Sequence, residues 1–507
     1  MLKNVGSNWV LNLFTIAVAL VMGPLVVGIL GKEGDGVWQL VVAATALLSL
    51  VVLGVPMASV RYFSEHLARE DEAGFNRAVG SCMGLYLGLG CLALAAGAVF
   101  YLPFDWGLEE VVKAGKVAPH WLSDARLAYW LVTGYVAFGF FGQLPYGIMV
   151  AHHDFVLRNK IMMSGLLLKL LLVWGLLTLE TSVAMLALAQ VGALLFEFLT
   201  ARWLVARIYP RVRMRLKDFD LGMVRKIFSF SIYVLLLQLG IKLSFQMDAL
   251  VIGWFLDARN VSYYNRSNMF IVYLVEFLVA IGAVVMPTAT KLRVQERTAE
   301  LEEVFFKWSK VAMTLTVLAC LFLAVLGPEF VAAWLNQPEY KAPGEEILPL
   351  LMASCVFFLP VRGVGLPLLM GLGKPGVPTI AFLVAGVLNL SLSVLLAPLM
   401  GLRGVALGTA LPNVIFAFVV GAYACRVAGV SSMRYLLYVV PRVLLGSLPA
   451  LAFVLWLKLM VGIEGRLEVI MAGVSTCLVF AACAVFLIWR KDPYVDPMRF
   501  LERLRRR

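Results

Sequence analysis

Ionisable and amide side chains lie inside an apolar stretch that runs from residue 228 to 255. The stretch is long enough to cross a bilayer, since about 20 apolar residues span a hydrocarbon core of ~30 Å. Gln238, Lys242 and Gln246 recur every fourth residue, so a helix would place them in one stripe, with Asp248 on the neighbouring flank. Such a helix should face protein or water, and its charges indicate a binding or proton-exchange site. The alternatives are a salt bridge to a neighbouring helix and snorkelling of Lys242 to the interface.

Two further basic residues occur inside apolar segments. Lys169 lies near the middle of the fifth segment, and Glu197 in the sixth is a candidate ion-pair partner for it. Arg362 lies inside the tenth segment and is followed by Gly363, Gly365 and Pro367. This pattern predicts a broken or closely packed helix around an intramembrane arginine.

Polar residues at other positions extend the set of candidates. Asn12 belongs to a stripe with Asn4, Asn8 and Thr15, for which hydrogen bonding between helices is the favoured alternative. Arg61 ends the second segment, where it is either an ordinary interfacial arginine or a residue at the inner mouth of a cavity. The eighth segment carries Asn268 and Glu276.

The composition is that of a polytopic membrane protein, because 62% of the 507 residues are hydrophobic and only 15% are charged. The apolar runs predict about fourteen membrane-spanning helices. Lys and Arg concentrate in the loops after even-numbered spans and in the C-terminal tail, which predicts that both termini are cytoplasmic. The net charge of +12 is therefore mostly a topology signal, and nucleic-acid binding is not expected.

The sequence does not favour an enzyme. Its seven cysteines lie in or at the ends of spans, and His152, His153 and Asp154 lack the spacing of metal ligands. No nucleotide-binding, hydrolase or metalloprotease motif is present, and the loops leave no room for a catalytic domain. We therefore expect no catalytic residues, no metal and no bound cofactor.

A basic loop at residues 207–227 divides the chain into two comparable halves with faint similarity to each other. We predict an N-lobe of six helices at 1–206, a cytoplasmic linker at 207–227 and a C-lobe of six helices at 228–425. Residues 426–507 would add two lipid-facing helices and a basic cytoplasmic tail. The expected fold is all-α, with two pseudo-symmetric lobes that enclose a site between them.

Several stretches together resemble one known family. These are Gly371 to Pro375, Val387 to Leu390 and Leu395 to Thr409, together with the Gly31-Lys32-Glu33 turn and Ser59-Val60-Arg61-Tyr62 near the start. The pattern resembles bacterial oligosaccharide and polysaccharide flippases of the multidrug/oligosaccharidyl-lipid/polysaccharide exporter superfamily. Asp248 occupies the position of the aspartate in that family's seventh span. One departure is Ser262, where the family pattern has glycine.

The resemblance implies a cell-membrane transporter that works by alternating access on an undecaprenyl-diphosphate-linked oligosaccharide. It implies polysaccharide polymerase and chain-length machinery as partners. A diphosphate needs cations in a low-dielectric cavity, so Lys242 and Arg362 rank first as its ligands, followed by Lys169 and Arg61.

Polar side chains would meet the glycan or support coupling in the same cavity. Asn12, Gln238, Gln246, Asn268 and Tyr264 would bind glycan hydroxyls. Asp248 and Glu276 would orient the bases or take part in coupling to H⁺ or Na⁺.

Four other functions compete with this interpretation. A multidrug cation antiporter of the same superfamily should have a more acidic or aromatic cavity, and the basic intramembrane charges speak against it. A flippase for a peptidoglycan lipid precursor would differ only in cargo. A membrane-embedded glycan polymerase or ligase would need a large external catalytic loop, and a structural scaffold would leave the buried charges unexplained.

Overall fold

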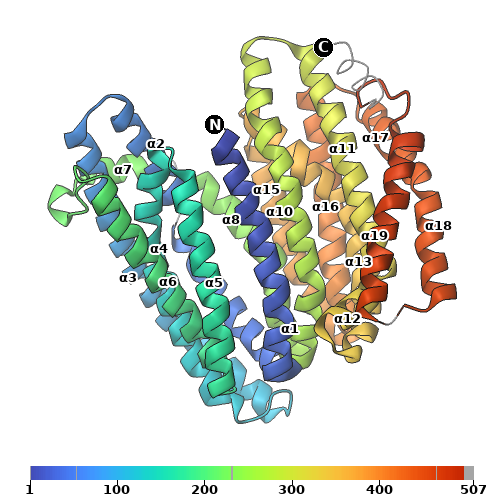
Figure 1. Ribbon diagram of the computed structural model, residues 1–507, viewed down its shortest axis with the longest axis horizontal. Helices are drawn as coiled ribbons and strands as arrows, with labels where there is room; N and C mark the ends of the chain where they lie inside the picture. Colours follow the sequence, from blue (N-terminus) through green and yellow to red (C-terminus); the bar gives the residue numbers. More distant parts are fainter. Residues whose placement is uncertain (1, 53, 230–231, 464, 496–507) are drawn as a thin grey trace. The chain divides into compact units, whose positions relative to one another are not determined.

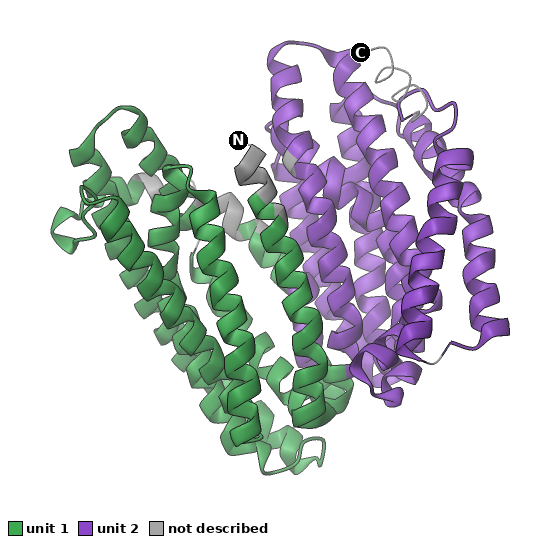
Figure 2. Cartoon of the chain, viewed as in Figure 1, with its two compact units in different colours: residues 1–242, 252–262 green, residues 243–251, 263–507 purple. Residues whose placement is uncertain are grey.

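The computed structural model describes residues 2–52, 54–229, 232–463 and 465–495, which form helices joined by turns (Figure 1). None of these residues belongs to a β-strand, and the predicted all-α membrane fold is confirmed. Two compact units make up the chain (Figure 2). Unit 1 contains residues 1–242 and 252–262, and unit 2 contains 243–251 and 263–507. The predicted lobe boundaries at 206 and 425 stay predictions.

In unit 1, most helices pack against α4 or α6. In it, α4 packs against α3 and α6, while α5 packs against α1 and α6. Its elements are α1 (Leu2–Ala46), η1 (Leu47–Val52), α2 (Val55–Ala68), α3 (Glu72–Lys113), α4 (Trp121–Ala151), α5 (Phe155–Leu179), α6 (Val183–Ile208), η2 (Leu216–Asp218), α7 (Leu221–Ser229) and most of α8 (Ile232–Phe245).

Unit 2 is organised around α13 and α16. Here α15 packs along α16, and α13 lies against both α11 and α16. Its elements are most of α10 (Ala258–Val294), α11 (Thr298–Val325), α12 (Gly327–Leu335), η3 (Pro338–Tyr340), α13 (Lys341–Pro360), η4 (Val361–Gly365), α14 (Leu366–Gly371), α15 (Gly376–Met400), α16 (Leu402–Val427), α17 (Ser432–Gly446), α18 (Leu448–Trp456), η5 (Leu457–Val461), α19 (Arg466–Cys483) and η6 (Ala484–Ile488). The short helix α9 (Met247–Phe255) is divided between the two units.

Twelve helical segments among the described residues are long and apolar enough to cross a membrane, against about fourteen predicted spans. Two features explain the difference. The first segment, Val10–Val52, covers two predicted spans, and α1 is interrupted within it at Gly31, whose φ of 68° is not helical. The predicted span at 228–255 contains two short helices, α8 and α9, because the helix breaks at Gln246.

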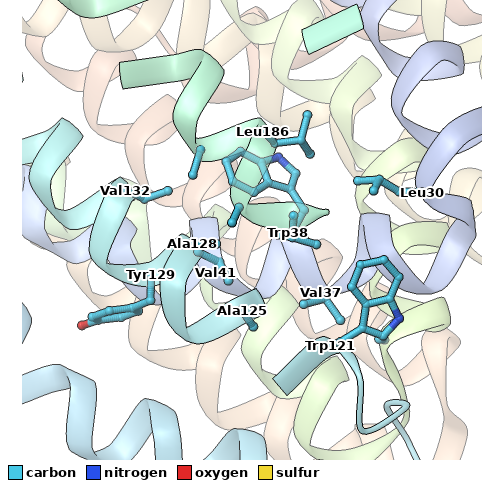
Figure 3. Close-up of a cluster of buried hydrophobic side chains, with 14 of the residues drawn as sticks. Leu30, Val37, Trp38, Val41, Trp121, Ala125, Ala128, Tyr129, Val132 and Leu186 are labelled. Atoms are coloured by element: carbon cyan, nitrogen blue, oxygen red, sulfur yellow. The ribbon is translucent and has the colours of Figure 1, made fainter. Parts of the chain in front are cut away.

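The core of unit 1 joins α1, α4 and α6 (Figure 3). Trp38 and Val41 from α1 pack with Ala125 and Ala128 from α4, and Leu186 from α6 completes the contact. Small residues such as these alanines let the backbones of membrane helices approach closely, which favours van der Waals packing.

The basic linker is tied to the start of α3. The Asn76 side chain donates to the Arg211 carbonyl at 3.2 Å and accepts from the Arg213 amide at 2.7 Å. One turn further along α3, the Ser81 hydroxyl accepts from the Asp220 amide at 2.9 Å. These hydrogen bonds attach residues 211–220 to α3 of unit 1.

The C-terminal helices are anchored to α11 and α12 at both ends. At one end, the ammonium of Lys310 forms a fully buried ion pair with Asp492, which also accepts from the Tyr438 hydroxyl at 2.5 Å. At the other end, Lys458 lies 3.3 Å from the Glu329 carboxylate and donates to the Val325 carbonyl at 2.9 Å. Polar anchors therefore hold helices that also present apolar side chains to lipid.

Candidate functional site

A buried cluster of hydroxyls surrounds the carboxylate of Asp248 in unit 2. The Oδ2 atom of Asp248 accepts from the Tyr264 hydroxyl at 2.9 Å and from Thr409 Oγ1 at 2.8 Å. Ser393 Oγ lies 3.4 Å from the other carboxylate oxygen, and the Asn389 amide donates to Thr409 Oγ1 at 2.9 Å. The four helices α9, α10, α15 and α16 each contribute to this oxygen-rich cluster.

Glycines on α16 make this close approach of helices possible. A Cβ atom at Gly408 would lie 2.4 Å from Ser393 Oγ, and one at Gly404 would lie 2.3 Å from the Leu396 carbonyl oxygen. Asn389 and Ser393 are four residues apart, so both face α16 from α15. The sequence Gly404 to Thr409 therefore brings Thr409 into hydrogen-bonding distance of α15.

The cluster retains an unused acceptor. Within the part of the chain that the structure describes, Asn389 Oδ1 is buried without a hydrogen-bond partner. A carboxylate, hydroxyls and an amide oxygen are ligands suited to a small hard cation, and the carboxylate alone suits a proton. The cluster therefore contains the oxygen ligands that either ion would need.

Arg362 occupies a π-helical turn, η4, between α13 and α14. Such turns are rare and occur often at functional sites. The neighbouring backbone is tightly packed, because a Cβ at Gly363 would lie 3.0 Å from the Leu278 carbonyl oxygen. The predicted irregular helix is confirmed.

The guanidinium of Arg362 is only partly exposed, and its central carbon lies 5.4 Å from the ring centre of Phe382. Among the residues that the structure describes, no carboxylate lies within 4 Å of it. Since a partly desolvated arginine favours an anionic partner, this side chain is suited to bind one.

The stripe predicted on 228–255 does not lie on one continuous helix. Gln238 is exposed and Lys242 half-buried on α8, whereas Gln246 is at the break and Asp248 follows on α9. The prediction of one regular helix was wrong, because it extrapolated helical periodicity across a turn. Lys242 lies in unit 1 and Asp248 in unit 2.

In unit 1, Lys169 is half-buried on α5, and Glu197 lies on α6. The predicted Lys169–Glu197 ion pair is absent at 4 Å within the described residues. Glu197 instead accepts a hydrogen bond of 2.9 Å from the Tyr146 hydroxyl. A neutral donor on α4 thus takes the place that we assigned to the lysine.

The remaining candidates lie in varied environments. Asn12 on α1, Arg61 on α2 and Glu276 on α10 are exposed, whereas Asn268 on α10 is buried. The Asn268 Oδ1 atom has no hydrogen-bond partner among the described residues. From the first polar stripe, Asn8 accepts at 2.7 Å from Asn159 on α5, which is the predicted hydrogen bonding between helices.

Sequence reasoning included Asn389 and Thr409 only in stretches that resemble the family, not as candidate site residues, and it did not single out Ser393. Its spacing of four residues from Asn389 was the available signal. Tyr264, expected to meet a glycan, is instead fully buried against Asp248.

Comparison with known proteins identifies the family. A family model described as "Polysaccharide biosynthesis protein" matches residues 1–293, which is more than half of the chain. The chain belongs to this family. A similar curated protein is the uncharacterized membrane protein MJ1068 of Methanocaldococcus jannaschii, 26% identical over 235 residues. That match spans 45% of this polysaccharide biosynthesis family member and 44% of the relative, so it covers less than half of the relative's length.

Solved structures show that this family member has the fold of transporters from the superfamily that the sequence resembles. The lipid II flippase MurJ in an inward closed conformation matches 95% of this chain and 98% of its own, with a TM-score of 0.68 and 16% identity. An inward-facing multidrug resistance MATE family transporter of the MOP superfamily covers 82% of this chain and 98% of its own, with a TM-score of 0.63 and 15% identity. At these identities the likeness concerns the fold alone.

Proposed function

We propose that this membrane protein is a flippase that moves an undecaprenyl-diphosphate-linked oligosaccharide from the cytoplasmic to the external leaflet by alternating access. The observation that carries the proposal is Arg362, a partly desolvated cation in a π-helical turn with no carboxylate within 4 Å in the described chain. A guanidinium there would grip the diphosphate bidentately.

Other residues complete the proposed cavity. Lys242 and Lys169 would add point charges for the diphosphate, and Arg61 would attract it at the cytoplasmic mouth. Glycan hydroxyls would meet Asn12, Gln238 and Gln246, which are at least partly exposed. The membership of a polysaccharide biosynthesis family supports a glycan cargo over a drug.

The test is transbilayer movement of radiolabelled undecaprenyl-diphosphate oligosaccharide in proteoliposomes. We expect Arg362→Ala to slow movement at least about tenfold, since one hydrogen bond to a charged group contributes about 1.5–3 kcal/mol. Arg362→Lys should recover part of the rate, because it keeps the charge but loses the planar fork. Arg403→Ala is the matched control, as this arginine is exposed at the start of α16.

Two rivals are tested in the same vesicles. Movement of lipid II in preference to the oligosaccharide would identify a peptidoglycan-precursor flippase. Export of a cationic dye, with neither lipid moved, would refute the flippase and favour the multidrug antiporter.

The Asp248 cluster supports a coupling role for H⁺ or Na⁺. Ion binding at Asp248 would break its hydrogen bonds to α10, α15 and α16 and so alter the packing of these helices. We expect Asp248→Asn to abolish the dependence of transport on an imposed ion gradient. Separate pH and Na⁺ gradients distinguish the two ions, and an unchanged dependence on both in Asp248→Asn would refute the role.

A further inference from the structure

Basic and apolar residues alternate along the linker between positions 211 and 217. The apolar members Val212 and Met214 are half-buried and pack against the core of unit 1. Because alternate side chains of an extended chain point to opposite sides, and the backbone of Arg215 is extended, the basic members point away from that core. All four of them are exposed, and we call them the cationic ladder: Arg211, Arg213, Arg215 and Lys217.

The backbone that carries the ladder is held closely against α3. A Cβ at Gly80 would lie 2.8 Å from the Arg215 carbonyl oxygen. A Cβ at Gly84, one turn further along α3, would lie 2.5 Å from the ring of Phe219. The two hydrogen bonds of Asn76 add to these contacts. Since a backbone that is already held in place loses little conformational entropy when a ligand binds, this attachment favours binding by the ladder.

Most of the ladder's charge is not compensated by carboxylates. Arg211 is paired with Glu72 at 2.6 Å, but none of the other three cations lies within 4 Å of a carboxylate among the residues that the structure describes. Two acids follow in the chain. Asp220 accepts from the Gly222 amide at 2.8 Å at the start of α7, and Asp218 is half-buried. The ladder therefore keeps a net positive charge that an anionic ligand could neutralise.

Exposed apolar side chains lie next to the ladder in the chain. The exposed fractions are 48% for Leu216, 46% for Phe219 and 71% for Leu221. A surface that combines cations with exposed apolar side chains is typical of a segment that lies in the membrane interface. An acidic polypeptide or a nucleic acid would meet only the cations and would leave the apolar side chains in water. The surface therefore fits a lipid better than either.

We propose that the cationic ladder binds the phosphate groups of anionic phospholipids in the cytoplasmic leaflet, and that the three exposed apolar side chains insert among the lipids beside it. The guanidinium groups of Arg213 and Arg215 would each grip a phosphate bidentately, and the Lys217 ammonium would act as a point charge. The linker thereby attaches unit 1 to the leaflet surface. This inference is independent of the proposed transport function, because it concerns the lipids of the bilayer and not the cargo.

The test is binding of phosphatidylglycerol to the full chain, measured by native mass spectrometry of the protein titrated with lipid in mixed micelles. One basic residue near an anionic surface contributes about fivefold to the affinity. The triple variant Arg213→Gln, Arg215→Gln and Lys217→Gln should therefore bind phosphatidylglycerol at least about tenfold more weakly than the native protein. Its binding of the zwitterionic phosphatidylcholine should not change.

A matched control makes the same change of charge at three exposed basic residues that are far apart in the chain: Lys291→Gln, Lys374→Gln and Arg426→Gln. This variant should bind phosphatidylglycerol as tightly as the native protein, because it leaves the ladder intact. An equal loss of binding in both triple variants, or no loss in the ladder variant, would overturn the proposal.

The variant Leu221→Gln distinguishes a lipid from a soluble anion. It keeps every ladder charge and removes an apolar side chain, so it should weaken binding of phosphatidylglycerol. Binding of glycerophosphoglycerol, the soluble head group without acyl chains, should be the same in Leu221→Gln and native protein. If the native protein binds glycerophosphoglycerol or polyglutamate as tightly as phosphatidylglycerol, the ladder serves a soluble anionic partner and the lipid proposal fails.

Discussion

Removal of the buried ammonium at Lys310 should destabilise unit 2 more than any loss of a surface charge. Lys310 and Asp492 are both fully buried, and the ammonium also lies 4.2 Å from the ring centre of Tyr438. Breaking a buried ion pair by truncating one partner costs about 3–5 kcal/mol, because a charge is left without compensation. Arg442 remains 3.8 Å from Asp492 and partly compensates its charge. We therefore expect Lys310→Met to lower the free energy of unfolding by about 3 kcal/mol, near the lower end of this range.

The double variant Lys310→Met with Asp492→Asn separates the charge effect from lost packing. It removes both charges and keeps an amide at position 492. We therefore expect its free energy of unfolding to be at least about 2 kcal/mol higher than that of Lys310→Met. Free energies of unfolding would be compared by titration with sodium dodecyl sulfate in mixed micelles. Arg297→Met, which removes an exposed partner of the exposed Glu300 in the same unit, is a control with an expected loss of about 1 kcal/mol or less.

The pH dependence provides a second signature of the pair. Burial raises the pKa of Asp492, but hydrogen bonds from Lys310 and Tyr438 outweigh it and hold the pKa below the usual 3.8. A depressed folded-state pKa stabilises the protein above the unfolded-state pKa, and this contribution is lost as the pH falls through the folded value. The contribution of the native pair to the free energy of unfolding should thus stay constant between pH 7 and about 5.

In Lys310→Met, burial still raises the pKa of Asp492, but the hydrogen bond from the lysine that lowers it is gone. Protonation of Asp492 at lower pH should therefore restore part of the free energy of unfolding that this variant loses. The reasoning would be refuted if Lys310→Met lost less than about 1 kcal/mol, or if the double variant were no more stable than Lys310→Met.

Three further predictions concern backbone contacts. Gly36→Ala should lower the free energy of unfolding by about 3 kcal/mol or more, because the added Cβ would clash with the Ala258 carbonyl oxygen. Gly28→Ala, which meets nothing within 4 Å, should change stability by less than about 1 kcal/mol in the same detergent titration. Asn76→Ala should raise the rate of tryptic cleavage in the linker about tenfold by removing two hydrogen bonds, and an unchanged cleavage rate would show that other contacts hold the linker. Gly408→Ala should separate α15 from α16 at the Asp248 cluster and weaken ion-dependent transport, while Gly175→Ala, with open space around it, should leave transport unchanged.

The sequence predicted the helices and several irregularities, because these depend on local composition. Apolar runs predicted the spans, and Pro and Gly around Arg362 predicted a distorted helix, which is the π-helical turn η4. The break at Gln246 was not predicted, since no Gly or Pro marks it.

Contacts between distant residues were harder to predict. Asp248 and Thr409 are 161 positions apart, and only the fold brings them within 2.8 Å. Likewise, Glu197 was expected to meet Lys169 on charge alone, yet the helix packing places Tyr146 within hydrogen-bonding distance instead. Charge complementarity indicates which pairs would be favourable, whereas helix packing decides which pairs meet.

The placement of residues 252–262 also bears on how the protein is synthesised. A ribosome that has completed the basic linker has not yet made Ala258, which is part of the unit 1 core, or Ser262, which donates a hydrogen bond to Asp35. Until residues 252–262 have been synthesised and inserted, the N-terminal half therefore lies in the membrane without the Ala258 backbone that packs against Gly36. A gene divided at residue 228 should give an N-terminal fragment that is degraded alone and rescued by coexpression of the other half.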